Sequence, residues 1–225
     1  MVPLNLVNSG RRCIVLLLGF ACATELAWRI YRKYFKSHNK GQLQSNRPIN
    51  EVLFFSEQSM ICRNHINSNT ACYMPTCPMI PLNKLIAYLS SATRSIDICV
   101  YFFTCNAIVN EIIKMHRKNI IIRVITDDES SSNESSQIYT LRKAGIKVRT
   151  KNSTYLMHHK FALVDRKLLI SGSANWTIQA FFGNCENIIV TNQSELVSAY
   201  VNEFEKVWLR FNGEFNTSFQ NFLTI

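Results

Sequence analysis

Short apolar segments alternate with amphipathic stretches from residue 51 to residue 211, and this alternation constrains the fold more than any other feature of the sequence. Segments rich in β-branched and aromatic residues predict strands at 51–55, 95–103, 119–127, 146–150, 159–165, 167–172 and 186–191. Apolar residues at helical spacing predict helices at 81–94, 107–118, 136–145 and about 194–211. Because strands separated by helices build βαβ units, we expect an α/β fold in which helices sandwich a mixed β-sheet.

Composition narrows the class of protein. Of the 225 residues, 47% are hydrophobic and 18% are charged, which is enough apolar material for a core and excludes a disordered chain. The net charge of +10 is concentrated in residues 1–47, which hold eight basic side chains against one acidic one. A basic segment of this kind favours binding to a membrane surface over binding to a nucleic acid. A basic surface on the rest of the protein can still bind a polyanion.

One apolar run, residues 13–28, lies near the N-terminus. As a helix it would span roughly 24 Å, slightly less than the apolar core of a bilayer. Two interpretations are open, a cleavable secretory signal or a retained membrane anchor. The basic block at 31–36 favours the anchor, because clustered cations resist translocation and keep their side of the membrane in the cytosol.

A group of residues at fixed offsets carries the chemistry: His158, Lys160, Asp165, Gly172, Ser173 and Asn175. Side chains two apart on a strand share a face, so those of His158 and Lys160 should point together and that of His159 away. A histidine beside a lysine is an unusual core pair, because burying either without a partner is costly. Asp165 has the opposite parity, so it reaches the same site only from a strand end or a bulge.

The pattern H-x-K-x4-D followed by G-S-x-N resembles the signature of the phospholipase D superfamily. The wider chain, as far as the segment NCENIIV, resembles the Zucchini family, also called mitochondrial phospholipase D or mitochondrial cardiolipin hydrolase. The resemblance implies a phospholipase D-like half with one catalytic motif. It divides the chain into a membrane anchor with a basic flank at 1–35, a linker at 36–50 and a catalytic domain at 51–225, with a small zinc element at 62–77.

Phosphodiester cleavage needs a nucleophile, a proton for the leaving oxygen and cations for the non-bridging oxygens. The imidazole of His158 can attack phosphorus to form a phosphohistidine, while Lys160 and the amide of Asn175 hold the oxygens in place of a metal ion. Ser173 can add another hydrogen bond. By resemblance to the family, Glu186 fixes the tautomer of the attacking ring and Asp165 supports the site. We therefore expect no catalytic metal.

Only one such motif is present, whereas the chemistry needs two histidines that face each other. A two-fold homodimer would place both copies at its axis, and the family resemblance implies the same. We therefore expect a homodimer with a shared active site.

A second cluster lies in the loop after the first predicted strand: Cys62, His65, Cys72 and Cys77. Thiolates and imidazole suit Zn²⁺, and a closed four-ligand site is structural rather than catalytic. Scattered free cysteines are the alternative, since the spacing is not that of a common zinc finger. The family resemblance includes a Cys3His zinc element at this place, so we expect one structural Zn²⁺ per chain.

A row of cations precedes the motif and is followed by an aromatic residue: Arg142, Lys143, Lys147, Arg149 and Lys151, then Tyr155. Such a row can follow a phosphate backbone, and the tyrosine ring can stack on a base. A solvated helix end and loop is the alternative interpretation. No base-reading pattern is visible, so we expect little sequence preference.

The preferred hypothesis is an endoribonuclease that cuts single-stranded RNA. The family resemblance implies a setting in piRNA biogenesis, with proteins of that pathway as partners, on the mitochondrial outer membrane and facing the cytosol; composition alone fits the endoplasmic reticulum equally well. The alternative is a phospholipase D that hydrolyses cardiolipin to phosphatidic acid with the same residues, which should show an apolar channel or patch beside the site. A non-catalytic, membrane-tethered RNA-binding scaffold is a third hypothesis, against which the complete set of motif residues argues.

Overall fold

The computed structural model describes residues 24–29, 47–56, 62–64, 72, 74–128, 136–151 and 153–211. The chain divides into two compact units, Met1–Arg47 and Pro48–Ile225. In the first unit, residues 24–29 form an exposed helix. No helix within the described residues is long and apolar enough to cross a membrane, and most of the predicted anchor lies outside them.

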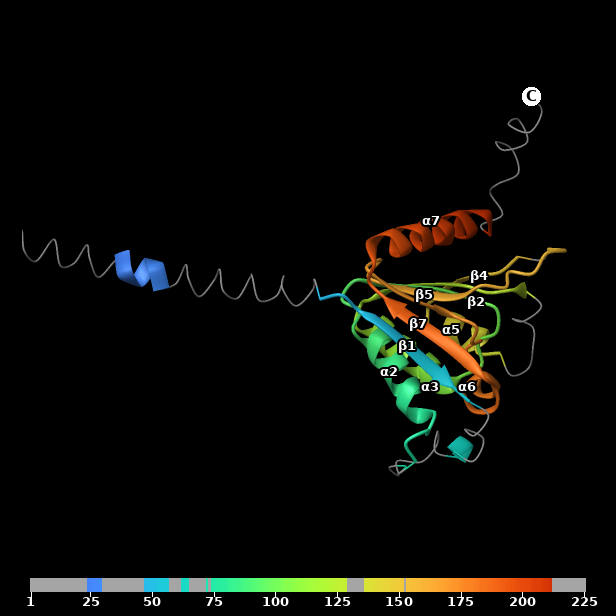
Figure 1. Cartoon of the computed structure of the whole chain (residues 1–225). Coiled ribbons are helices and arrows are strands. Elements are labelled where there is room, and N and C mark those ends of the chain that lie inside the picture. The colour runs from blue at the N-terminus through green and yellow to red at the C-terminus, as the bar shows by residue number, and fades with distance from the viewer. Residues whose placement is uncertain are drawn as a thin grey trace, which may run out of the picture. The chain divides into compact units, whose positions relative to one another are not determined.

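Within the described residues, seven strands form one mixed sheet in the order β1-β7-β6-β5-β2-β3-β4 (Figure 1). The strands are β1 (Asn50–Phe55), β2 (Ser95–Val100), β3 (Ile121–Ile125), β4 (Lys147–Arg149), β5 (Lys160–Val164), β6 (Leu168–Gly172) and β7 (Glu186–Thr191). The pairs β2–β3 and β3–β4 are parallel, and all other neighbouring pairs are antiparallel. Each parallel pair is joined through a helix, because parallel neighbours need a crossover connection, whereas a tight turn joins β5 to β6.

Helices cover the two faces of this sheet unequally. On one face lie α2 (Met79–Ser90), α3 (Asn106–Arg117), α5 (Ile138–Lys143) and α6 (Ile178–Gly183), and on the other lies α7 (Ser194–Arg210) (Figure 1). Side chains along a strand alternate between the two cores: Ala162 belongs to the larger core under the four helices, and Phe161 and Leu163 to the smaller one under α7. The predicted fold, a mixed sheet between helices, is confirmed.

Among the residues that the structure describes, no helix covers the β1–β7 end of the sheet on its α7 side. Val52 pairs with Ile189, and Ile189 pairs with Ser171. Ser171 in turn pairs with Phe161, a member of the core under α7, so this row of side chains lies on the α7 side. Val52, Phe54 and Ile189 are 47%, 71% and 47% exposed. We call these three residues the β1–β7 apolar face.

An ion cluster fixes α7 to the sheet. Arg123 on β3 donates to both carboxylate oxygens of Asp97 at 2.8 Å and to Glu205 on α7 at 2.8 Å. Arg166, in the turn after β5, also donates to Glu205. The guanidinium of Arg123 lies 4.7 Å from the ring centroid of Phe204. Because Asp97 is only 1% exposed, this pairing satisfies a charge that would otherwise be costly to bury.

Several elements differ from the sequence-based prediction: α5 and β3 are shorter at both ends, and helix α6, helix α2 and strand β2 differ as follows. The short helix α6 was not predicted; it begins after Thr177, whose Oγ1 accepts a hydrogen bond from the N–H of Ala180 at 3.0 Å. Helix α2 begins at Met79, so that Pro81 lies in its first turn, where backbone N–H groups have no partner within the helix. The strand predicted at 95–103 is shorter, because the pairing of β2 with β5 ends at its Val100.

Candidate active site

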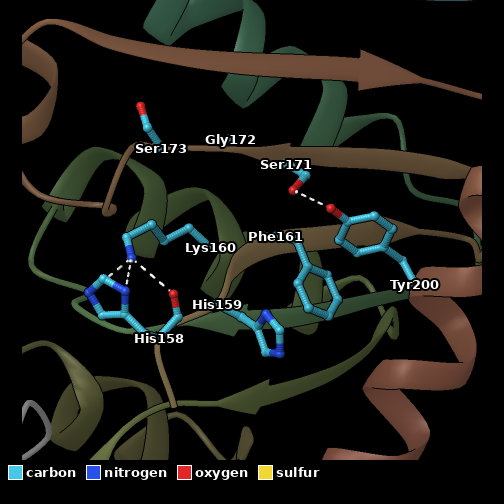
Figure 2. A pocket seen from close by; sticks show the side chains of 8 residues that line it. All are labelled: His158, His159, Lys160, Phe161, Ser171, Gly172, Ser173 and Tyr200. Atoms are coloured by element: carbon cyan, nitrogen blue, oxygen red, sulfur yellow. Dashed lines mark hydrogen bonds between the residues drawn. The ribbon is translucent and has the colours of Figure 1, made fainter. Parts of the chain in front are cut away.

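A pocket of about 420 Å³ opens where β5 begins and β6 ends (Figure 2). Its lining consists of His158, His159, Lys160, Phe161, Ser171, Gly172, Ser173 and Tyr200. The two halves of the motif meet here because β5 and β6 pair in antiparallel fashion. Tyr200 of α7 closes one side, with its hydroxyl 3.1 Å from that of Ser171. The structure therefore brings three predicted site residues, His158, Lys160 and Ser173, into one pocket.

His158 and Lys160 form a close pair (Figure 2). The Nζ of Lys160 lies 3.1 Å from Nδ1 and 3.2 Å from Nε2 of His158, and it donates to the carbonyl oxygen of His158 at 2.9 Å. The ring of His159 points away from the pair and lies 3.6 Å from Glu203. Burial lowers the pKa of His158, and the charge of Lys160 lowers it further. The ring is therefore neutral at neutral pH and offers a nitrogen lone pair.

Ser173 and Glu186 form a second pair beside the pocket. The hydroxyl of Ser173 donates to Oε2 of Glu186, and Nδ2 of Asn184 donates to Oε1 at 3.0 Å. Within one chain both oxygens of Glu186 are thus bound by these neighbours, and its predicted role toward the ring of His158 stays a prediction. The charge of Glu186 acts on Lys160: burial lowers the pKa of Lys160, and Glu186 opposes that shift.

Asn175 lies two residues beyond Ser173 and is not among the residues that line the pocket. Its Oδ1 is buried and has no hydrogen-bond partner among the described residues. The next residue, Trp176, is firmly held, since its N–H donates to the carbonyl of Phe102 at 3.0 Å and its ring packs edge-on against Phe103 at 5.2 Å. The backbone beside Asn175 is therefore fixed, while the carboxamide oxygen is not committed to the fold.

Asp165 lies at the opposite end of β5 from the pocket. Its carboxylate accepts hydrogen bonds of 2.7–3.1 Å from the backbone N–H groups of Thr93, Arg94 and Ser95. Positive φ angles of 53° at Asp165 and 54° at Arg166 form the tight turn between β5 and β6. Asp165 therefore ties this turn to the start of β2, and the structure does not bring it together with His158.

The predicted RNA-binding row follows an edge of the sheet. It runs along the end of α5, the edge strand β4 and the segment after it, as Arg142, Lys143, Lys147, Arg149 and Lys151. Four of the five are exposed, but Arg149 serves the fold. Its guanidinium donates to the carbonyl of Trp208 at 2.6 Å and lies 4.0 Å from the centroid of that ring. Tyr155, in the segment before the motif, is 84% exposed.

The cysteine cluster comes together as far as the structure describes it. The sulfur atoms of Cys62, Cys72 and Cys77 all lie within 4.8 Å of one another. Burial raises the pKa of Cys62 to about 11, whereas a hydrogen bond from the N–H of Met74 lowers that of Cys72. Three thiols at this separation can hold a metal ion, and soft sulfur ligands fit Zn²⁺. The fourth predicted ligand, His65, lies outside the described residues.

Sequence reasoning missed three residues around the pocket. The ring of Tyr101 packs against that of His158, with centroids 4.8 Å apart. Oδ2 of Asp127 accepts a hydrogen bond from the N–H of Met157 at 3.0 Å. Tyr101 lies near the end of the strand predicted at 95–103, and Asp127 is the last residue of the strand predicted at 119–127. Ligand sites of α/β sheets gather at strand ends, so these positions could have indicated the site. Tyr200 gave no such signal, because only the packing of α7 brings it to the pocket.

A mixed sheet that presents a neutral histidine beside a lysine in an open pocket defines a class of enzyme. Residues 85–208 match the family model described as "Cardiolipin synthase, PLD-like domain". The protein is thus a phosphodiesterase of the phospholipase D superfamily.

Similar proteins from other organisms identify the family within this superfamily. The mitochondrial cardiolipin hydrolase of Xenopus laevis is 34% identical over 200 residues, which cover 87% of this chain and 88% of that protein. The protein of the same name from Danio rerio is 39% identical over 170 residues, covering 73% and 74%. The chain belongs to this mitochondrial cardiolipin hydrolase family, as the sequence resemblance indicated.

Solved structures agree with the fold. NucT from Helicobacter pylori superimposes with a TM-score of 0.57 at 28% identity, covering 71% of this chain and 95% of that one. Nuc from Salmonella typhimurium, a phospholipase D family member, gives a TM-score of 0.58 at 20% identity, covering 72% and 95%. At that lower identity the likeness to Nuc concerns the fold alone.

Proposed function

We propose that this chain is a single-strand-specific endoribonuclease that acts as a homodimer through a phosphohistidine intermediate. The observation that carries the proposal is the pairing of a neutral His158 with the ammonium group of Lys160 in an open pocket. A neutral ring nitrogen is nucleophilic, and a fixed cation beside it can hold phosphodiester oxygens as their negative charge grows.

The proposed reaction has two displacements. In the first, a ring nitrogen of His158 attacks phosphorus, so that an N–P bond forms and the P–O bond to the leaving group breaks. A second imidazole, which enters the reaction as the protonated ring while His158 enters as the neutral one, gives the leaving oxygen a proton. In the second, water attacks phosphorus and gives a proton back to that imidazole, while the N–P bond breaks and His158 is restored. Lys160 remains a cation throughout.

The second imidazole in this scheme is the partner's His158. One chain carries one motif, and its pocket is lined by Phe161 and Ser171 on the α7 side of the sheet. The β1–β7 apolar face lies on the same side and is exposed. An exposed apolar surface beside an incomplete site fits a second copy of the chain. For the two His158 rings to face each other, the interface must also include the ends of β5 and β6, because Lys160 pairs with Val100 of the larger core and so points away from the α7 side.

The pocket lining favours a nucleic acid over acyl chains as substrate. Phe161 and Tyr200 are its aromatic members, and none of its eight residues is aliphatic. Acyl chains need a continuous apolar surface, whereas nucleotides are bound by cations and stacking rings. The exposed members of the cationic row and the 84% exposed Tyr155 offer both kinds of contact without reading a base sequence.

Cardiolipin hydrolysis is the second candidate. Its support is the shared name of the relatives, together with the β1–β7 apolar face, which would rest on lipid if no second copy covered it. The same two histidines would then release phosphatidic acid. The two candidates use one chemistry and differ in what binds beside the pocket.

The setting that we propose is piRNA biogenesis at the cytosolic surface of the mitochondrial outer membrane, with proteins of that pathway as partners. Its support is the mitochondrial name of the relatives, the apolar run at 13–28, the basic residues that follow it and the family resemblance. The thiols of Cys62, Cys72 and Cys77, with His65, would hold one structural Zn²⁺ that orders the loop between β1 and α2.

The discriminating experiment offers both substrates side by side. The full chain in detergent solution is incubated with end-labelled single-stranded RNA, with the same RNA as a duplex, and with cardiolipin liposomes. We expect cleavage of the single strand, little cleavage of the duplex, and no cleavage by the variant His158→Asn. Release of phosphatidic acid without RNA cleavage would instead establish the lipid as substrate.

A further inference from the structure

A buried carboxylate that the proposed chemistry does not use lies next to the catalytic segment. Asp127 follows β3 and is only 6% exposed. Its Oδ2 accepts a hydrogen bond of 3.0 Å from the N–H of Met157, the residue directly before His158. Burying a carboxylate costs free energy, so a buried carboxylate beside the catalytic histidine suggests that it has a role there.

The ends of two strands hold the backbone on both sides of His158. Asp127 binds the residue before His158, and Tyr101 binds the residue after it: the N–H of Tyr101 donates to the carbonyl of His159 at 2.9 Å. The ring of Tyr101 packs against that of His158 at 4.8 Å. Tyr101 is held in turn by Thr126, whose hydroxyl donates to its carbonyl at 2.9 Å. Because Thr126 and Asp127 are neighbours, the end of β3 anchors the segment before and after the catalytic ring.

The charge of Asp127 also reaches the ring. The charged or titratable groups that act on His158 are Lys160 on β5, His159 beside it and Asp127 beyond β3. Burial and Lys160 favour the neutral ring, and Asp127 opposes them by favouring a cation. Within one chain, the charge of Asp127 acts on His158 and that of Glu186 acts on Lys160.

A cationic ring is what the proposed reaction makes. When the N–P bond forms and the leaving oxygen departs with a proton from the second imidazole, the phosphorylated ring of His158 carries a positive charge until water attacks. A fixed negative charge nearby lowers the free energy of that state without being able to compete as a nucleophile, because it is buried and hydrogen-bonded.

We infer that Asp127 is a positioning residue of this active site: it fixes the backbone before His158 and supplies the negative charge that faces the ring when the ring becomes a cation. The kinetic part of this inference rests on the proposed function. The structural part, that Asp127 sets the electrostatic surroundings of His158, does not.

The test compares Asp127→Asn with Asp127→Ala in the full chain in detergent solution. Asparagine keeps an acceptor oxygen for the N–H of Met157 and removes the charge, whereas alanine removes both. Glu111→Gln is the matched control, because Glu111 is a half-buried carboxylate on α3 that hydrogen-bonds Ser90 at 2.8 Å. Two measurements are made on each variant: an NMR titration of the His158 ring, and the pH profile of kcat and KM with bis(p-nitrophenyl) phosphate.

For Asp127→Asn we expect an unchanged melting temperature, a lower pKa of His158, and an acid limb of kcat/KM that moves to lower pH. We expect kcat to fall roughly 10- to 100-fold while KM changes little. Asp127→Ala should lose more activity, and the control should match the wild type. A merely structural role would be fully rescued by asparagine, with the titration of His158 unmoved, and this result would overturn the inference. If the wild type does not turn over the diester, the proposed function fails, but the NMR titration still decides the role of Asp127.

Discussion

Lys160 holds its ammonium nitrogen within 3.2 Å of both ring nitrogens of His158, so a positive charge faces whichever nitrogen carries the lone pair. The spacing of two residues at the start of β5 places both side chains in the same pocket. In the proposed mechanism this pair supplies both the nucleophile and the cation that receives the phosphodiester oxygens.

Replacing His158 with asparagine should abolish turnover, by roughly 10³-fold or more, because no other group of the chain takes the place of the nucleophile. Folding should be unchanged, since His158 belongs to neither hydrophobic core. The measurement is steady-state cleavage of RNA alongside the melting temperature. His116→Asn, on α3 and away from the pocket, is the matched histidine control and should retain activity. Equal turnover by His158→Asn would reject His158 as the nucleophile.

Replacing Lys160 with methionine should raise the pKa of His158 toward its ordinary value of 6.5. Burial is the largest cause of the lowered pKa in the wild type and would remain, but the repulsion from the ammonium group would be gone. A neutral ring is needed for attack, so the acid limb of the residual activity should move to higher pH. An NMR titration of the ring measures the shift directly. Lys167→Met, at the far end of β5, is the control, and an unchanged or lower pKa in Lys160→Met would contradict the account.

Replacing Phe54 with glutamate should prevent dimerisation. A charge on the β1–β7 apolar face would have to be buried against the second copy, which costs several kcal/mol. The expected result is a folded monomer without activity, measured by analytical ultracentrifugation together with RNA cleavage. Tyr139→Glu places the same charge on a 74% exposed residue of α5 and should stay dimeric. An active dimer of Phe54→Glu would show that the two copies meet elsewhere.

Much of the fold was predictable because local patterns agree with the tertiary structure. Each of the seven strands falls within or beside a predicted segment, and Gly145, two residues after the last residue of α5, has a φ of 86° that stops the helix close to the predicted end at 145. The helix α6 escaped prediction because it is only six residues long and its amphipathic pattern is too short to recognise. The order of the strands depends on long-range pairing, such as that of β1 with β7, which no local pattern encodes.

The site was predictable only where chain neighbours share it. His158 and Lys160 lie together because they are two residues apart where β5 begins, whereas Asp165 follows the other end of β5, where it accepts hydrogen bonds from backbone N–H groups at the start of β2. The sequence predicted that Arg149 binds phosphate, but its guanidinium packs on the ring of Trp208. Trp208 belongs to α7, far away in the sequence, so no local pattern indicated this contact. Asp127 was missed because its partner, Met157, is thirty residues away in the sequence.

Replacing Cys72 with serine should lower both zinc content and stability. If the site contributes about 3 kcal/mol, the melting temperature should fall by roughly 6–12 °C in a chain of this size. Metal analysis and thermal unfolding measure the two effects. Cys185→Ser, an exposed cysteine outside the cluster, is the control and should change neither. Brief treatment with a chelator should spare turnover, and a zinc-free Cys72→Ser protein of full stability would refute a structural zinc site.

Replacing Arg123 with methionine should destabilise the protein by about 3–5 kcal/mol, because the carboxylate of Asp97 would remain buried without its main partner. Lys206→Met removes an exposed partner of Glu203 and should cost about 1 kcal/mol or less. Urea unfolding measures both. Nearly equal decreases in the free energy of unfolding for the two variants would show that the buried ion cluster does not fix α7.

The same cluster makes stability depend on pH in a definite direction. The hydrogen bond from Arg123 is the largest cause that lowers the pKa of Glu205 below its ordinary value of 4.5. A carboxyl group with a lowered pKa contributes stability that is fully present above the pKa of the unfolded chain and is lost as the pH falls through the folded value. The free energy of unfolding should therefore drop below pH 4.5 in the wild type. Arg123→Met should lose the part of this dependence that Glu205 provides.

Trapping the covalent intermediate tests the central claim most directly. The full chain is mixed with single-stranded RNA in the presence of a chelator, quenched during turnover under conditions that preserve phosphoramidates, and digested for mass spectrometry. The account predicts a phosphoryl-linked adduct on the peptide that contains His158, present in the wild type and absent from His158→Asn. Turnover without any adduct on a histidine, or an adduct on a different residue, would contradict it.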